Sequence, residues 1–186
     1  MDTPTSPSPA EVYDRQFVPA LFQYWTGIMT DNADIKPGQK VLDVACGTGV
    51  LACAAARQAG PDGQVVGLDP NPEMLSVARA KDNRIEWREG QAESLPFAEA
   101  SFDHVVSQFG FMFFEDQKAA LLEMMRVLRP GGRLTVAVCD AIDHSPGYAV
   151  LAELLHRLFG ADVAQAFRAP FSSGERQQLM LSLIHI

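Results

Sequence analysis

The chain has 186 residues, of which 47 % are hydrophobic and 20 % charged, so its composition excludes global disorder and fits one globular domain. Fifteen Lys and Arg against 23 Asp and Glu give a net charge of −8, which disfavours nucleic acid and anionic membrane surfaces as partners. Three cysteines without a CxxC pattern indicate neither a disulfide framework nor a metal site. Because we find no signal peptide and no apolar run of membrane-spanning length, we expect a cytoplasmic protein.

The first thirty residues predict a tail followed by a helix. Ser, Thr and Pro alternate near the N-terminus, so we expect a disordered tail over residues 1–10 and the domain over residues 11–180. Apolar residues then recur at helical spacing, and Pro19 is expected in the first turn of this helix. We interpret the apolar stripe as core-facing, and a partial cover over a binding cleft would be an addition to this role. The stripe comprises Val18, Leu21, Phe22, Trp25, Ile28 and Met29.

A strand, a glycine turn, a helix and a second strand come next. Residues 40–44 form a short apolar run typical of a buried strand, and Gly47-Thr48-Gly49 separates it from an Ala-rich helix at 50–59. Residues 64–69 predict the second strand. Asn71, as an N-cap followed by proline, opens another helix. These elements make a complete βαβ unit.

The same alternation continues to about residue 139. We expect strands at 84–88, 102–107 and 133–139, a helix at 116–128, and a turn at 129–132. Strands separated by helices favour an α/β, Rossmann-like, doubly wound and mostly parallel sheet with helices on both faces. Leucines from Leu151 onward predict a further helix, and another is expected to start near Ser173.

The glycine turn marks the edge of the sheet at which ligands of this fold class bind. Gly47, Gly49 and Ala52 match a loose G-x-G-x-x-G/A pattern, and Asp69 ends the next strand. Both dinucleotides and S-adenosylmethionine need close backbone approach and a carboxylate for the ribose hydroxyls. Asp43 favours S-adenosylmethionine over a dinucleotide, because a carboxylate at this place repels a pyrophosphate and attracts a cationic cofactor.

The order of motifs resembles class I S-adenosylmethionine-dependent methyltransferases, in the quinone-biosynthesis-like (methyltransferase type 11) branch. Five motifs occur in the order of that family, which makes a chance match improbable. They are Val41-Leu42-Asp43-Val44-Ala45-Cys46-Gly47-Thr48-Gly49, Gly67-Leu68-Asp69-Pro70-Asn71-Pro72-Glu73-Met74-Leu75, Glu89-Gly90-Gln91-Ala92-Glu93-Ser94-Leu95-Pro96-Phe97, Ser101-Phe102-Asp103 and Arg126-Val127-Leu128-Arg129-Pro130-Gly131-Gly132.

The resemblance implies S-adenosyl-L-methionine as cofactor and assigns residues to it. Asp69 is expected to bind the ribose, and Met74, Gln91 and Ala92 the adenine. The methionine end falls to Asp43, Ala45, Gly47 and Gly49, with Gln108 also against the cofactor. Two residues depart from the common pattern, since Ala45 replaces a glycine and Gln91 an aspartate.

Methyl transfer by in-line displacement needs neither a metal nor a covalent intermediate, so we expect no metal site. The segments after the fourth and fifth strands are expected to line the acceptor pocket, and their aromatic residues suggest a small aromatic or apolar acceptor. The pocket residues expected are Phe109, Phe111, Met112 and Cys139, and the polar candidates for catalysis are Gln108, Asp140 and His144. His104, inside a buried strand, is expected to be a packed histidine with both ring nitrogens satisfied.

Two other functions stay open from the sequence. A protein or subunit that binds the cofactor without turnover would share these motifs, and an NAD-dependent oxidoreductase would share the glycine turn. The sequence does not fix the oligomeric state or the acceptor. Enzymes of this branch close their sheet with an antiparallel strand pair, strands 6 and 7, which we do not find. Because residues 181–186 resemble a translated sequencing adapter, we expect a non-native tail and a C-terminally truncated chain.

Overall fold

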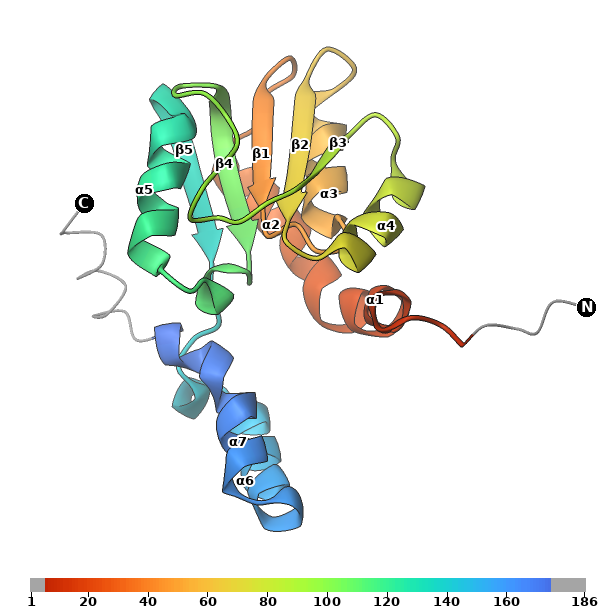
Figure 1. Cartoon of the computed structure of the whole chain (residues 1–186), viewed down its shortest axis with the longest axis vertical. Coiled ribbons are helices and arrows are strands. Elements are labelled where there is room, and N and C mark those ends of the chain that lie inside the picture. The colour runs from red at the N-terminus through yellow and green to blue at the C-terminus, as the bar shows by residue number, and fades with distance from the viewer. Residues whose placement is uncertain (1–5, 175–186) are drawn as a thin grey trace, which may run out of the picture.

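The computed structural model describes residues 6–174 and contains the predicted parallel sheet (Figure 1). Its five strands are arranged in the order β3-β2-β1-β4-β5, and every neighbouring pair is parallel. The α/β doubly wound architecture is therefore confirmed. The strands are β1 (Lys40–Val44), β2 (Gln64–Asp69), β3 (Glu86–Glu89), β4 (Phe102–Gln108) and β5 (Leu128–Ala137).

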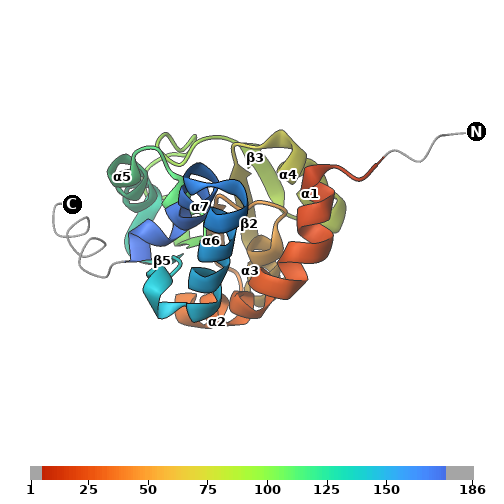
Figure 2. The ribbon, with the colours of Figure 1, turned by 90° about the horizontal axis from the view of Figure 1, so that it is seen from below.

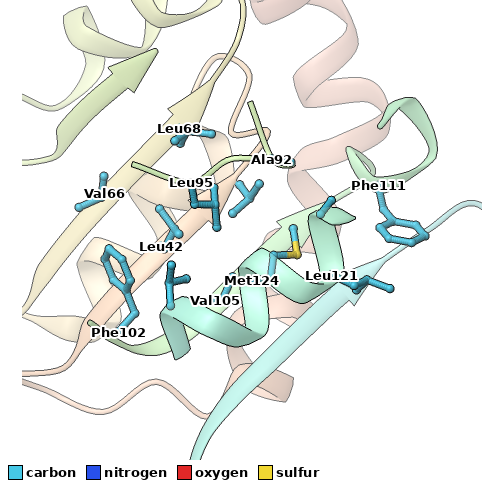
Figure 3. Close-up of a cluster of buried hydrophobic side chains, with 13 residues drawn as sticks. Leu42, Val66, Leu68, Ala92, Leu95, Phe102, Val105, Phe111, Leu121 and Met124 are labelled. Atoms are coloured by element: carbon cyan, nitrogen blue, oxygen red, sulfur yellow. The ribbon is translucent and has the colours of Figure 1, made fainter. Parts of the chain in front are cut away.

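Helices cover both faces of the sheet, and a separate hydrophobic cluster lies under each layer. One face packs against α2 (Gln23–Ala33) and α3 (Val50–Ala59), with α4 (Pro72–Lys81) beside them. The other face packs against α5 (Gln117–Val127), where Leu42, Val105 and Met124 are fully buried (Figure 3). Side chains alternate between the faces along each strand, so both clusters draw on the same short apolar runs.

The N-terminal helix begins earlier than the sequence indicates. Helix α1 (Pro9–Val12) is capped by Ser8. The Ser8 hydroxyl accepts from the Glu11 N–H, and the Glu11 carboxylate accepts from the Ser8 N–H, which together form a capping box. The last two residues of the expected tail are thus helical. A π-helical segment, η1 (Tyr13–Phe22), then leads into α2. Pro19 lies inside η1 rather than in a first turn, because the helical segment begins ten residues before it, at Pro9, directly after the Ser8 capping box.

Two strand boundaries also differ from the prediction. Strand β3 starts two residues later than expected, and β5 already begins at Leu128, which pairs with Phe102. Residues 129–132, expected as a free turn, form a bulge in this ladder, where the register shifts between Phe102 and His104. Pairing on both sides of the proline and glycines outweighs their local preference for a turn.

Beyond β5 the chain leaves the sheet at its carboxyl edge. A short turn, η3 (Ile142–His144), leads into α6 (Pro146–Phe159), α7 (Ala161–Arg168) and η4 (Ala169–Gly174), and the pair α6–α7 projects from that edge (Figures 1 and 2). Within residues 6–174, no helix is long and apolar enough to span a membrane. The expected helix beyond Ser173 and the expected tail at 181–186 fall outside the described residues.

His104 corrects one expectation about the core. Its Nε2 lies 2.8 Å from Gln39 Oε1, but Nδ1 is buried without a hydrogen-bond partner among the described residues. Burial lowers the pKa of the imidazole. The ring is packed as predicted, with one nitrogen satisfied instead of two.

Candidate functional site

Three polar side chains reach the same face at the carboxyl edge of the sheet. Asp43 is on β1 opposite Gly67 of β2, Asp69 ends β2, and Gln108 ends β4. The two-residue repeat of each strand places them on the face covered by α3, because Val41, Val65 and Val106 of the same strands pack there. Hence the fold gathers these polar groups at the point where the glycine turn leads from β1 into α3.

Two adjoining cavities lie at this edge. The large cavity, of about 560 Å³, extends along Asp69, Met74 and the segment that follows Gln108. The small cavity, of about 40 Å³, lies between Asp43 and the start of α3. The two are contiguous because both are lined by Tyr13, Ala45, Gly47 and Gln108. A pocket at this edge is where open α/β sheets bind their ligands.

Asp43 is a buried carboxyl group that lacks a full set of partners. The residue is 1 % exposed, and its Oδ2 has no hydrogen-bond partner among the described residues. Burial raises the pKa of Asp43 well above its usual range, the Ala52 N–H opposes this shift, and the charge of Asp69 adds to it. An unpaired acceptor of this kind calls for a donor, preferably a cationic one.

Gln108 presents a second unpaired acceptor to the same small cavity. Its Nε2 donates to the Phe22 carbonyl oxygen at 3.1 Å, which fixes the orientation of the amide. Its Oε1 is buried and has no partner in the described part of the chain. Asp43 and Gln108 therefore bring two buried acceptors, and no donor, to one cavity of small size.

Asp69 faces the large cavity and at the same time holds the loops around it. Its Oδ2 accepts from the Gly47 N–H at 2.8 Å, and its Oδ1 accepts from the Asn71 N–H at 2.9 Å. Burial raises the pKa of Asp69, and both hydrogen bonds counteract this rise. Each carboxylate oxygen keeps a lone pair, so the group can still accept two hydroxyl donors.

Most of the residues predicted to contact the cofactor line these cavities. They are Asp43, Ala45, Gly47, Asp69, Met74, Gln91, Ala92 and Gln108, and the predicted acceptor-pocket residue Phe109 lies with them. Gly49 lines neither cavity. It caps α3 with a left-handed backbone and passes so close to the ring of Trp87 that a methyl group there would overlap it.

Five predicted pocket or catalytic residues line neither cavity. Phe111 is 1 % exposed and belongs to the core beneath α5 (Figure 3), because its short 3-10 turn points this ring inward and leaves Phe113 outside. Cys139, Asp140 and His144 line neither cavity. The Asp140 carboxylate instead lies 3.2 Å from His144 Nδ1 on the exposed segment that leads into α6.

Met112 also lines neither of the two cavities, although its neighbours on both sides in the loop face one of them or the core. Phe113 and Phe114, in the segment after β4 that was expected to line the acceptor pocket, line the large cavity. The sequence did not single out four other lining residues as site residues, namely Thr48, Asn71, Glu93 and Glu115.

The N-terminal segment η1 supplies the largest part that the sequence did not predict. Tyr13 lines both cavities and Phe22 the small one, and their rings stack with centroids 5.5 Å apart. Phe109 contacts both Phe22 and Trp25, with centroids 5.8 and 5.9 Å apart. Val18 and Met29 of the stripe are buried, as the core-facing interpretation predicts, and Phe22 and Trp25 also cover part of the site. Leu21, Trp25 and Ile28 of the stripe are about 40 % exposed.

Ala45 and Gly110 form a tight contact across the floor of the site. Ala45 has a left-handed backbone, with φ of 58°, and a Cβ built on Gly110 would lie 2.5 Å from the Ala45 methyl group. Gly110 therefore makes room for the methyl group of Ala45.

A double-mutant cycle tests this contact. We expect Gly110→Ala to lower the free energy of unfolding by about 1–3 kcal/mol through overpacking, and Ala45→Gly to restore most of the loss. Ala45→Gly alone should cost little, because relief of the left-handed strain offsets the added freedom of the unfolded chain. Chemical denaturation of the four proteins measures the coupling, and equal losses in both backgrounds would disprove it.

Comparison with known proteins identifies the family. Residues 42–136, about half of the chain, match the family model described as "Methyltransferase domain". The chain is 42 % identical over 122 residues to the "Ubiquinone/menaquinone biosynthesis C-methyltransferase UbiE" of Hahella chejuensis, covering 62 % of this chain and 49 % of that protein. It is 36 % identical over 143 residues to the "Demethylmenaquinone methyltransferase" of Bacillus cereus, covering 73 % of this chain and 60 % of that one.

The fold has counterparts among solved structures. The crystal structure of a "putative s-adenosyl-l-methionine-dependent methyltransferase" from Methanococcus maripaludis superposes with a TM-score of 0.69 at 20 % identity, over 95 % of this chain and 80 % of that one. The chain spans about half to three fifths of the length of the two curated relatives. From the family match and the motifs that line the site, the chain belongs to the methyltransferase-domain family, in the class I group that uses S-adenosyl-L-methionine and includes quinone-biosynthesis enzymes.

Proposed function

We propose that this chain binds S-adenosyl-L-methionine in the two contiguous cavities and transfers its methyl group to a small apolar acceptor. The observation that carries the proposal is the pair of buried, unpartnered acceptors, Asp43 Oδ2 and Gln108 Oε1, at the small cavity. A primary ammonium group donates hydrogen bonds and carries a positive charge, so it satisfies both acceptors at once. The residues present therefore fit the amino-acid end of this cofactor.

The rest of the cofactor fits the large cavity. Asp69 has free lone pairs for the ribose hydroxyls, and Met74, Gln91 and Ala92 offer an apolar surface and polar edge groups for the adenine. Bound there, the cofactor supplies an electrophilic methyl group on a sulfonium. The part of the chain is to orient the two reactants in line and to exclude water, and orientation of this kind contributes about 7–11 kcal/mol.

A quinone-like acceptor is the substrate class that we propose. The wall beyond Gln108 is aromatic, because Phe109, Phe113 and Phe114 line the large cavity. The curated relatives carry ubiquinone, menaquinone and demethylmenaquinone in their names, which supports an acceptor of similar chemistry. Of the three candidates for catalysis, Gln108 alone lines the cavities, and a carboxamide cannot take up the proton of an acceptor. The cytoplasmic setting and the absence of a nucleic-acid partner remain predictions.

Titration calorimetry of the chain against S-adenosylmethionine, S-adenosylhomocysteine and NAD tests the cofactor class. We expect binding of the first two and none of NAD, because Asp43 opposes a pyrophosphate. Transfer of labelled methyl groups to a panel of reduced quinones then tests catalysis. Cofactor binding without transfer to any acceptor would favour the non-catalytic alternative, and binding of NAD alone would favour the oxidoreductase.

Asp43 also predicts how stability depends on pH. Its pKa in the folded chain is raised above the ordinary 3.8, so the folded state keeps a proton that the unfolded state has lost. Stability therefore falls as the pH rises from about 4 through the raised pKa. We expect Asp43→Asn to be more stable than the wild type at neutral pH, and the difference to vanish near pH 4. Thermal unfolding of both proteins without cofactor measures it; a difference independent of pH contradicts the prediction.

A further inference from the structure

No basic side chain is found among the described residues that line the two cavities. Their charged lining residues are all acidic, namely Asp43, Asp69, Glu93 and Glu115. Under the proposed function, the amino-acid end of the cofactor brings a carboxylate as well as an ammonium group. A carboxylate in a cavity of this charge needs N–H or O–H donors, because leaving it without partners is costly. The donor has to be a neutral group.

The position of the ammonium group restricts where this donor can be. Asp43 and Gln108 place the ammonium at the small cavity, and the carboxylate is attached to the same carbon atom. The donor therefore has to line the small cavity too. The side-chain hydroxyls that do so belong to Tyr13 and Thr48, since the Gln108 amide group already donates to Phe22.

Tyr13 is the better placed of the two hydroxyls. Its side-chain hydroxyl has no hydrogen-bond partner among the described residues, and the residue lines both cavities. Burial, with smaller contributions from Asp69 and Asp14, raises the pKa of Tyr13 to about 12, so the hydroxyl keeps its proton as a donor. Thr48 is 1 % exposed, and its hydroxyl oxygen already accepts from the Lys81 ammonium group at 3.4 Å, so it is the less accessible of the two.

Contacts on both sides hold Tyr13 over the site. Its ring stacks on Phe22 and, with centroids 6.2 Å apart, on Phe17. The next residue, Asp14, forms an ion pair with Lys81 of α4, and this pair fastens η1 to the body of the domain. The hydroxyl is thus held in place by packing and charge before any ligand binds, which lowers the entropic cost of using it.

We infer that the Tyr13 hydroxyl is the side-chain donor for the carboxylate of the cofactor's amino-acid end. The inference rests on the proposed function and adds a residue from outside the matched family segment, which starts at residue 42. With this donor, the N-terminal segment η1 contributes directly to cofactor binding. The amino-acid end of the cofactor then has three side-chain contacts, from Asp43, Gln108 and Tyr13.

Two ligands that differ only at the amino-acid end test the inference. S-adenosylhomocysteine carries the carboxylate and ammonium groups, whereas 5′-methylthioadenosine keeps the adenine, ribose and sulfur without them. We expect Tyr13→Phe to weaken binding of S-adenosylhomocysteine about 10-fold, the loss typical of one hydrogen bond to a charged group, and to leave binding of methylthioadenosine unchanged. Tyr24→Phe removes the same hydroxyl from a side chain on α2 that is 76 % exposed, and should change neither affinity.

Calorimetry of the three proteins, each checked by thermal unfolding, separates the outcomes. Equal losses for both ligands would assign Tyr13 to the ribose or to packing and overturn the inference. Unchanged binding of S-adenosylhomocysteine would also overturn it, leaving Thr48 or the backbone N–H groups at the start of α3 as donors; Thr48→Val would then show the loss. A wild-type chain that binds neither ligand contradicts the proposed function itself.

Discussion

Replacement of Asp69 by asparagine is expected to weaken binding of S-adenosylmethionine at least about 100-fold, the largest effect of any single change at the site. The carboxylate accepts from the Gly47 and Asn71 N–H groups through different oxygens and has lone pairs left for the ribose. An asparagine has one acceptor oxygen, and its NH₂ group would face a backbone N–H. The variant therefore loses one loop contact and one ribose contact, together with the negative charge.

Calorimetric titration of Asp69→Asn with S-adenosylmethionine measures this loss. Asp62→Asn is a matched control, because Asp62 is an exposed aspartate in the loop between α3 and β2. The control should bind like the wild type. Wild-type affinity in Asp69→Asn would mean that the ribose is bound elsewhere and would contradict the proposed arrangement of the cofactor.

Gly49→Ala is expected to have the largest effect on stability. The backbone of Gly49 is left-handed, with φ of 83°, which costs a residue with a side chain about 1–2 kcal/mol. In addition, its Cβ would lie 2.4 Å from Trp87 Cη2 and 3.3 Å from the Ala78 methyl group, and overpacking of this kind adds about 1–3 kcal/mol. Trp87 has little room to retreat, since it also packs against Gly67 and donates from Nε1 to the Asp82 carbonyl oxygen.

Gly38→Ala separates the two contributions to this loss. Gly38 has the same φ of 83°, but a Cβ there would meet no atom within 4 Å. Chemical denaturation should therefore show a loss of about 1–2 kcal/mol in Gly38→Ala and a clearly larger one in Gly49→Ala. Equal losses would mean that Trp87 yields freely, and that Gly49 is required for its backbone conformation alone.

The elements that could be predicted from the sequence are those specified by local patterns. Asn71 lies two and three residues before the helix positions whose N–H groups it caps, and its Oδ1 accepts from the Glu73 N–H at 2.9 Å and from the Met74 N–H at 3.4 Å. The alternation of apolar strands and helices likewise predicts the parallel, doubly wound sheet that the structure contains. Asp43 and Asp69 follow from the ends of two such strands, so the sheet brings them to one edge without information from elsewhere in the chain.

The residues that could not be predicted depend on contacts between distant segments. Tyr13 is held at the site by its packing on Phe22 and by the ion pair of Asp14 with Lys81, a residue 67 positions away. The aromatic run after β4 has no clear period, and its single 3-10 turn decides that Phe111 is buried while Phe113 is 67 % exposed. Asp140 and His144 follow β5 at the edge of the sheet where the site lies, but the chain turns away there into the projecting helices.

A crystal structure of the chain with S-adenosylhomocysteine tests the central claim most directly. The ammonium group should lie within hydrogen-bonding distance of Asp43 Oδ2 and Gln108 Oε1, the two acceptors that now lack a donor. The ribose hydroxyls should lie against Asp69 in the large cavity. Ligand density outside these two cavities, or a pose in which Asp43 and Gln108 stay unpaired, would contradict the account.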